Sequence, residues 1–590
     1  MSHMHLICPE DLLSANKNLK YFGGKITARF ILWILGFSKL NRDYSGNSHL
    51  KGSEFLDKLI AIYGLKYELS EDDNKKIPGK GPFIIISNHP TGGAEGILLI
   101  KLFSDKRADF KFLTNFLLSK IEPMKDYFLP VNPFEDHKNT LSSMAGIKNA
   151  LEHVRNGASL GIFPAGEVSA YQKGKREVTD REWLTVVLKL IKKAQVPVIP
   201  VYVEARNSPL FYFLGKINPL LRTVKLPSEL LNKKNQVLKI RIGSPVGINE
   251  QNLFTDIKEY GDFLRMKTYT LGRKVKKKKS LCCSPKEEMV VDEVRSDLII
   301  SEVNKLTEEN LLFKLENYKV FHAKSKTIPN ILREIGRLRE ITYREVGEGT
   351  GRSVDLDKYD AWYNHLFIWD EEAGCIVGAY RMGKGKELFE QFGIKGFYLQ
   401  SLFKFNEKLY PTLEKSIELG RSFIRKEYQR KTLSLFLLWK GILYFLIKHP
   451  EYRYLIGPAS ISNAFSDFSK GLIIEFLKTN CYNEELAKYV TPRNGFEYNL
   501  ADHIDVNVFL KYIGGDINRL DKFIHDVEPE QRIPVLFKKY IKQNARIIGF
   551  NVDPKFNYCL DVVMLLDIQD VPPEVIESLS KETSEATIAI

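Results

Sequence analysis

The stretch SNHPTGGAEG contains a histidine and a glutamate, His89 and Glu95, separated by five residues that include Gly92 and Gly93. A histidine works as a general base when a carboxylate holds its tautomer and stabilises its imidazolium form, and Glu95 is near enough in the sequence to do this. The same residues also fit a polar turn in which Glu95 occupies the favoured first turn of a helix. The decapeptide alone leaves a catalytic pair and a capped turn as equal alternatives.

The flanking residues place this stretch at the edge of a sheet. The apolar run PFIIIS (residues 82–87) predicts a strand before it, and EGILLIKLFSDKR (95–107) predicts a helix after it. Ligands of open α/β sheets bind at the carboxyl ends of the strands, where helix N-termini favour negative charge. The turn therefore has the setting of a substrate site, with backbone amides available to stabilise an oxyanion.

Strand and helix patterns alternate through the first half and change in the second. The first half has further strand patterns and a helix, which predicts an α/β domain with a central sheet flanked by helices; they lie at 158–167, 185–194 (helix), 197–205 and 236–246. The second half predicts an α+β sheet domain, with helices at 328–347 and 430–450 and strands at 365–370, 375–383, 397–405, 416–424 and 452–462.

Composition limits the classes of partner. The chain has 590 residues, a net charge of +14 and 44% hydrophobic residues, so we expect several domains and an anionic partner. It has no zinc finger, recognition-helix motif or RNA-binding aromatic signature, so nucleic acid is not expected. Six scattered cysteines without a C-x-x-C pair predict neither a disulfide framework nor a metal site. We expect no signal peptide and no spanning helix.

A basic stretch separates the two halves. Six of the seven residues from Arg273 to Lys279 are basic, and Cys282 and Cys283 follow. Such a run is typical of a solvated linker, and it also fits contact with an anionic membrane.

Three later blocks of the first half follow SNHPTGGAEG in order. GIFPAGEVSAY (161–171) ends a strand with Pro164, Gly166 and Glu167, VPVIPVYVEA (196–205) is a strand with prolines, and KIRIGSP closes the series. Over about 51–246 this order resembles the glycerolipid acyltransferases of the phosphatidic-acid-synthesis type. The resemblance implies direct acyl transfer to a hydroxyl, with His89 as base and Glu95 orienting it. It also implies a substrate site at Gly92, Gly93, Pro164, Gly166 and Glu167.

The departures from that family bear on the acceptor. The family has four residues between the histidine and an aspartate, and its Phe-Pro-Glu-Gly block is here Phe-Pro-Ala-Gly. The stretch at 127–138 lacks the arginine of the family's second block, although Lys138 is available in its place. Because that arginine and the missing glutamate accompany a glycerol phosphate acceptor in the family, the resemblance implies a different acceptor here.

Charged residues inside strand-like runs mark the second half. Arg381 in VGAYRM and the pair Glu418 and Arg421 in SIELGRSFI are costly to bury unless they are paired or belong to a site. A structural salt-bridge cluster is one interpretation. Together with LREITYREVG and LDKYD, these segments resemble, over about 318–567, the GNAT-fold acyltransferases that use acyl-carrier-protein thioesters. Those include the acyl-homoserine-lactone synthases and the N-acyltransferases of amino-acid-lipid synthesis.

This second resemblance implies an amine acceptor. It assigns Glu418 as the base and Arg339, Arg381 and Arg421 as groups that hold the carboxylate of a small amino acid. YQRKTLSL stands where acetyl-CoA users carry a glycine-rich loop, which favours acyl-ACP over acyl-CoA as the donor, with no bound cofactor. Acyl carrier proteins are acidic, so a basic enzyme suits them.

The two resemblances together imply a fused bifunctional bacterial glycine-lipid or ornithine-lipid synthase. The second half would N-acylate the amino acid with a 3-hydroxyacyl chain, and the first would O-acylate the resulting hydroxyl of the acyl-amino acid, at the cytoplasmic face of the inner membrane. Two alternatives stay open: a lysophospholipid acyltransferase with a regulatory GNAT-like domain, and a non-catalytic membrane or carrier-protein binding module. The expected divisions are amphipathic helices with membrane contact at 1–50, O-acyltransferase domain 51–270, linker 271–300, N-acyltransferase domain 301–570 and tail 571–590.

Overall fold

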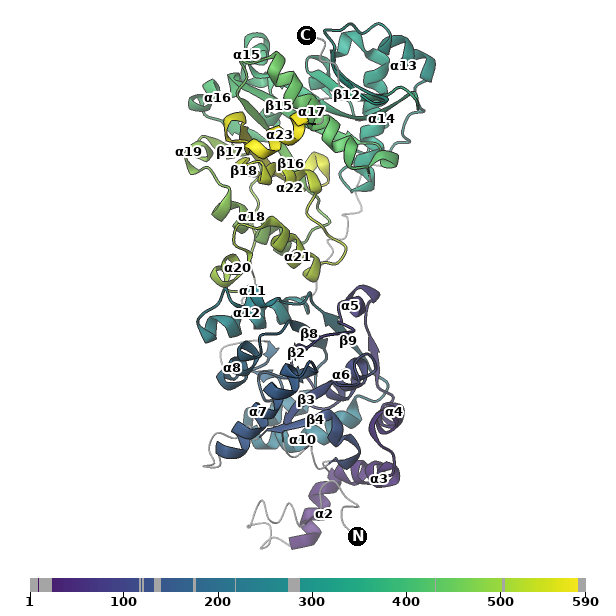
Figure 1. Cartoon of the computed structure of the whole chain (residues 1–590), viewed down its shortest axis with the longest axis vertical. Coiled ribbons are helices and arrows are strands. Elements are labelled where there is room, and N and C mark those ends of the chain that lie inside the picture. The colour runs from purple at the N-terminus through teal and green to yellow at the C-terminus, as the bar shows by residue number, and fades with distance from the viewer. Residues whose placement is uncertain are drawn as a thin grey trace. The chain divides into compact units, whose positions relative to one another are not determined.

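A computed structural model of the chain divides into two compact units (Figure 1). One comprises Met1–Lys274 with Asp502–Tyr512, and the other Val275–Ala501 with Ile513–Ile590. The predicted fold classes, α/β for the first half and α+β for the second, are confirmed. The structure describes residues 9, 24–34, 36–115, 118, 121–131, 140–172, 177–217, 219–273, 287–429, 431–500 and 504–581.

Seven strands form the main sheet of the first unit. Neighbouring strands run parallel except β8 and β9, which are antiparallel. In sheet order the strands are β1 (Lys66–Glu68), β9 (Val237–Ile242), β8 (Val198–Glu204), β2 (Phe83–Ser87), β5 (Ser159–Ile162), β3 (Lys111–Asn115) and β4 (Phe128–Val131). A small separate ribbon pairs β6 (Ala170–Tyr171) with β7 (Val178–Thr179).

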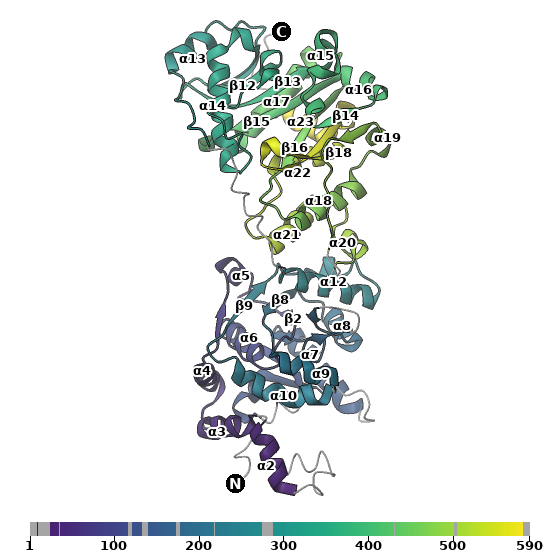
Figure 2. The ribbon, with the colours of Figure 1, turned by 180° about the vertical axis from the view of Figure 1, so that it is seen from behind.

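Helices cover the central strand β2, whose five residues are all buried. Phe83 and Ile85 share a core with side chains of α4 and α6, as expected for a strand packed inside an α/β sheet. Helices surround the sheet in the front and back views (Figures 1 and 2). The helices of this unit that come before residue 274 are α2 (Gly24–Ile34), α3 (Phe37–Asn47), α4 (Gly52–Tyr63), α5 (Glu71–Lys75), α6 (Ala94–Ser104), α7 (Thr140–Arg155), α8 (Thr185–Ala194), α9 (Pro209–Ile217), α10 (Pro219–Asn232), α11 (Ile248–Gln251) and α12 (Ile257–Thr270).

A segment from late in the sequence completes the first unit. It carries most of α20 (Val506–Ile513). The ring of Tyr512 lies 4.9 Å from that of Phe263, and its hydroxyl donates to Glu250 at 3.3 Å. The charge pattern of the sequence does not predict that this late segment belongs to the first unit. Its place there depends on a few side-chain contacts between residues far apart in the sequence.

An eight-stranded sheet forms the centre of the second unit. All neighbours are antiparallel except β15 and β16, which are parallel. In sheet order the strands are β10 (Leu311–Leu315), β11 (Tyr318–Lys324), β12 (Asn364–Asp370), β13 (Cys375–Lys384), β15 (Ser416–Ile424), β16 (Tyr454–Ile461), β19 (Cys559–Asp567) and β18 (Arg546–Asp553).

Long helices pack on this sheet. The helix α14 (Pro329–Glu345) begins with the proline that suits its first turn. The apolar helix α17 (Thr432–Lys448) lies against β10, β11, β12 and β13 (Figure 1). The other helices are α13 (Ser296–Val303), α15 (Gly385–Phe392), α16 (Tyr410–Glu414), α18 (Asp467–Asn480), α19 (Glu484–Ala487), α21 (Ile517–Val527), α22 (Val535–Lys542) and α23 (Pro573–Lys581).

The prediction of one strand at 397–405 was wrong. Tyr398–Ser401 forms a 3₁₀ turn, and only β14 (Phe403–Phe405) is extended, paired with β17 (Val490–Pro492) in a separate ribbon. Phe397, Leu399 and Phe403 are apolar because their side chains are buried in the tertiary structure. The segment therefore has the apolar pattern of a strand although most of it is a turn.

Several predicted features lie outside the described residues. These are the basic run from 274 onward, both Cys282 and Cys283, and Lys138. Within the described ranges, no helix is long and apolar enough to cross a bilayer.

Candidate active sites

The first candidate site follows strand β2. His89 lies two residues beyond the end of β2, and Glu95 is in the first turn of α6. The atoms His89 Nδ1 and Glu95 Oε1 are 2.9 Å apart. The Glu95 side chain is fully buried, whereas 17% of the His89 side chain is exposed, so a substrate can reach the ring. The structure thus brings the two predicted residues together.

The turn between these residues keeps the Glu95 carboxylate charged. Its oxygens accept hydrogen bonds from the backbone N–H groups of Thr91 (2.8 Å) and Gly92 (2.9 Å) and from the Thr91 hydroxyl. Burial alone raises the pKa of Glu95, but His89 and these donors outweigh it and lower the pKa to about 2. A buried anion beside the ring is what stabilises an imidazolium.

The two adjacent glycines of this turn have different environments. Gly92 has a φ of +90°, and a Cβ there would lie 2.6 Å from Leu226 Cδ2 and 2.9 Å from Val168 Cγ2. Gly93 has a negative φ, and a Cβ there would meet nothing nearer than Leu230 at 3.8 Å. Gly92 is therefore the position at which both conformation and space require glycine.

The FPAGE block (residues 163–167) packs against the histidine. The Phe163 ring stacks on the His89 ring with centroids 4.0 Å apart, and Pro164 behind it is buried. Gly166, with a φ of +69°, turns the chain, and the N–H of Ser169 then donates to the His89 carbonyl at 2.8 Å. The block thus forms one wall of the histidine site.

Two arginines that are not among the predicted site residues converge on this block. Glu167 pairs with Arg222 of α10 at 3.2 Å and with Arg181 at 3.5 Å, and Arg181 Nε also donates to the Ala165 carbonyl at 3.0 Å. Asp180 was also missed; it is buried and accepts from the His89 backbone N–H at 3.3 Å. These three residues belong to no motif, so only the fold identifies them.

The second candidate site begins where two parallel strands separate. The strands β15 and β16 pair only over Ser416–Glu418 and Tyr454–Ile456. A bulge follows in β15, where Arg421 has a φ of +54°. At Gly457 a Cβ would lie 2.2 Å from the Leu419 carbonyl oxygen, so a glycine is needed where the strands diverge.

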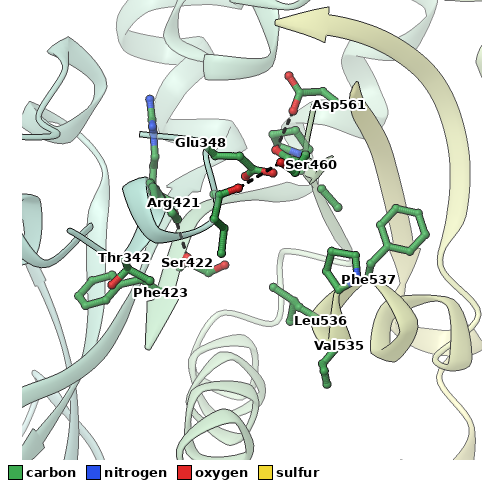
Figure 3. A pocket seen from close by; sticks show the side chains of 18 of the residues that line it. Thr342, Glu348, Arg421, Ser422, Phe423, Ser460, Val535, Leu536, Phe537 and Asp561 are labelled. Carbon is green, nitrogen blue, oxygen red and sulfur yellow. Dashed lines mark hydrogen bonds between the residues drawn. The ribbon is translucent and has the colours of Figure 1, made fainter. Parts of the chain in front are cut away.

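A cavity of about 1050 Å³ occupies the gap. Figure 3 shows Glu348, Ser460 and Asp561 together at one end and an apolar group from α22 at the other, namely Val535, Leu536 and Phe537. Gln531 and Arg532, just before α22, also line the cavity. Acids at one end and the apolar side chains of α22 at the other suit a substrate that has a charged head and a chain.

The three predicted arginines lie close together, but each of them already forms ion pairs with aspartates. Arg339 and Arg381 are 1% exposed and do not line the cavity. Arg421 does, but its guanidinium group points away from Glu348 in Figure 3 and pairs with aspartates. The ion pairs are Arg339–Asp355 (3.3 Å), Arg339–Asp360 (3.0 Å), Arg381–Asp357 (2.7 Å), Arg381–Asp360 (3.3 Å), Arg421–Asp355 (3.2 Å) and Arg421–Asp357 (3.4 Å).

Glu418 also lies outside the cavity lining. Its carboxylate accepts hydrogen bonds from the Tyr363 hydroxyl and from the backbone N–H groups of Leu399 (2.7 Å) and Tyr398 (3.0 Å). Burial raises its pKa to about 7. Two of these three hydrogen bonds hold the 398–399 turn, whose Tyr398 does line the cavity.

The acidic residues of the cavity itself were not predicted. Glu348 directly follows the helix predicted at 328–347, among other charged residues, and Asp561 stands in an apolar strand. A charge inside such a strand is the signal that identified Arg381, and it applies equally to Asp561. Among the described residues, no cluster of His, Cys, Asp and Glu is arranged to hold a metal ion.

Comparison with known proteins gives two family matches. Residues 36–277 match the family described as acyltransferase, and residues 338–440 match the acetyltransferase (GNAT) domain. The glycine N(alpha)-acyltransferase of Phocaeicola vulgatus is 30% identical over 240 residues, which cover 39% of this chain and 67% of the relative. The chain is an acyltransferase and belongs to the family of this relative.

Other relatives extend the match to both kinds of acyl transfer. The glycine N(alpha)-acyltransferase of Bacteroides thetaiotaomicron is 29% identical over 283 residues, 46% of this acyltransferase and 77% of the relative. The lyso-glycine lipid O-acyltransferase of Phocaeicola vulgatus is 26% identical over 250 residues, 41% and 86% respectively. One chain therefore combines likeness to an N-acyltransferase and to an O-acyltransferase.

Proposed function

We propose that the chain makes a diacylated amino acid in two steps. The second unit N-acylates a small amino acid, glycine in the first instance, with a 3-hydroxyacyl thioester. The first unit then O-acylates the hydroxyl of that product. The observation that carries the proposal is the similarity of one chain to both a glycine N(alpha)-acyltransferase and a lyso-glycine lipid O-acyltransferase.

The first unit supplies a base for the hydroxyl. His89 takes the proton of the acceptor hydroxyl as its oxygen attacks the thioester carbonyl, and Glu95 orients the ring and balances its charge. The exposed part of the ring and the wall made by Phe163 and the FPAGE block support this role. No acyl-enzyme intermediate is needed, because the two substrates react directly.

The acceptor of the first unit is an anion without a phosphate. The Arg181 and Arg222 side chains beside Glu167 give the block a net positive charge, which suits the single carboxylate of an N-acylated amino acid. Gly92, Gly93, Pro164 and Gly166 form the backbone of that site.

The second unit places its reaction in the gap between β15 and β16. The apolar end of the cavity takes the acyl chain and the polar end takes the amino acid. Arg339, Arg381 and Arg421 hold the 355–360 segment through their aspartate pairs. Glu418 positions the 398–399 turn, whose Tyr398 lines the cavity. These residues therefore position the site instead of contacting the substrate through their charges.

The donor is an acyl carrier protein thioester, and the protein works at a membrane surface. Its net charge of +14 suits both an acidic carrier protein and anionic lipids. Both products are amphiphiles, which favours a peripheral position at the cytoplasmic face of the inner membrane.

Mass spectrometry of lipids tests the proposal. Cells that do not make acylated amino acids are given the full chain, and their extract is compared with that of cells carrying an empty vector. We expect both mono- and diacylated amino acids. An extract without any acylated amino acid overturns the proposal, and newly formed phosphatidic acid in its place points to a lysophospholipid acyltransferase.

A further inference from the structure

We infer that Glu348 and Asp561 bind the ammonium group of the amino-acid acceptor and take its proton before it attacks the thioester. This inference rests on the N-acylation proposed above and adds the residues that carry out its proton transfer. Neither residue is among the site residues predicted for the second half.

The position of these residues follows from the sheet. Asp561 lies on β19 directly opposite Ser460 of β16, on the part of β16 that has separated from β15. Glu348 comes from the loop after α14 and reaches the same end of the cavity (Figure 3). The two carboxyl groups therefore face the gap in which a thioester and an amine can meet.

Among the described residues, the acids at this end of the cavity have no cationic partner. Within the residues that the structure describes, no Lys or Arg forms an ion pair with Glu348 or Asp561, and the nearby Asp553 adds a third carboxylate. The other groups near Asp561 are neutral ones: the Ser460 hydroxyl, which donates at 2.8 Å, the Cys559 thiol at 3.7 Å and Tyr398. The two nearby cations, Arg421 and Lys555, act on Asp553, and the guanidinium group of Arg421 pairs with other aspartates.

A cationic ligand complements such a surface. A cavity with the buried Asp561 and the half-buried Glu348 at one end and apolar side chains at the other fits an ammonium group next to an acyl chain. This is the arrangement that N-acylation of an amino acid requires.

The environment of the acids also suits proton transfer. Burial raises the pKa of Glu348 to about 7, and burial together with the charge of Asp553 raises that of Asp561 to about 7. A carboxylate with a pKa near neutrality takes a proton from an ammonium more readily than an ordinary carboxylate does.

The ammonium gives one proton to the carboxylate, and the freed lone pair forms a C–N bond with the thioester carbonyl carbon. The C–S bond then breaks, the thiolate takes a second proton from nitrogen, and the carboxyl group returns its proton to water. The products are an amide and a free thiol.

A comparison of two acyl acceptors, glycine and hydroxylamine, distinguishes a role in proton removal from a role in positioning. Glycine is an ammonium at neutral pH and must lose a proton, whereas hydroxylamine is largely uncharged and needs no base before attack. The full-length protein is assayed with a 3-hydroxyacyl thioester of acyl carrier protein and either acceptor. For Asp561→Asn and Glu348→Gln we expect glycine acylation to fall by about 100-fold or more, while hydroxamate formation falls by much less.

The control is Glu371→Gln, which removes a carboxylate that pairs with Lys314 and Lys319 away from the cavity, and it should leave both rates unchanged. The pH profile is a second measurement: glycine acylation by the wild type should fall below pH 7, and that limb should disappear from the residual activity when Asp561→Asn and Glu348→Gln are combined. Equal losses with both acceptors, or full glycine activity in both variants, overturn the inference. A wild type that forms hydroxamate but never acyl-glycine overturns the proposed function itself, and this inference with it.

Discussion

The Nδ1 atom of His89 and the Oε1 atom of Glu95 meet at 2.9 Å although five residues separate them. The left-handed conformation of Gly92 folds the intervening turn tightly enough for its N–H and that of Thr91 to bind the same carboxylate. The longer glutamate side chain then spans the remaining distance. A spacing that departs from the family pattern thus yields the same contact between imidazole and carboxylate.

Replacing His89 by alanine should separate the two activities. Without its base the first unit should lose O-acylation by about 100- to 10,000-fold, whereas the second unit keeps its own site. Lipid mass spectrometry should then show the monoacylated amino acid accumulating. His49→Ala, a change at an exposed histidine, is the control. Normal diacylated product from His89→Ala would contradict the role of His89.

Glu95→Gln should change how stability depends on pH. The pKa of Glu95 falls from 4.5 in an unfolded chain to about 2, so its ionised form stabilises the fold above pH 4.5 and this contribution is lost as pH falls towards 2. At about 1.4 kcal/mol per pKa unit, the contribution is about 3 kcal/mol. Denaturant unfolding of the wild type and the variant at several pH values measures it.

The difference in unfolding free energy between these two proteins should shrink across that pH window. Glu54→Gln, at an exposed glutamate of α4, provides the comparison. A difference that stays constant with pH would show that Glu95 stabilises the fold without its charge.

The two glycines of the turn should respond differently to alanine. Gly92→Ala forces a positive φ on a residue with a Cβ and drives that Cβ into Leu226, so we expect a loss of about 1–3 kcal/mol. Gly93→Ala meets only ordinary contacts and should be close to wild type. Thermal unfolding and the O-acylation rate should both rank the variants in this order, and equal effects would refute the assignment.

Glu418→Gln should act on positioning and not on proton transfer. The amide places an NH₂ group where three donors now converge, so the 398–399 turn that borders the cavity should shift. We expect acylation of glycine and of hydroxylamine to fall by the same factor. A loss confined to glycine would instead support Glu418 as the base.

The sequence alone was sufficient for the two fold classes, because apolar periodicity depends on local geometry. It also identified His89 and Glu95, since they are neighbours in one turn whose glycines mark it. The motifs of the second half pointed correctly to buried charge: Arg339, Arg381, Arg421 and Glu418 are all buried or nearly so.

What the sequence did not decide is where those charges point. Arg381 lies on β13, and its partner Asp357 comes from a loop 24 residues earlier, so only the packed structure shows that aspartates already occupy the arginines. The same holds for Asp561, which is more than 200 residues from Glu348 in the chain. The motifs fixed local turns and burial, whereas the separation of β15 from β16 created the cavity. That separation depends on a bulge and on pairing between distant strands, which are properties of the folded sheet and not of any local segment.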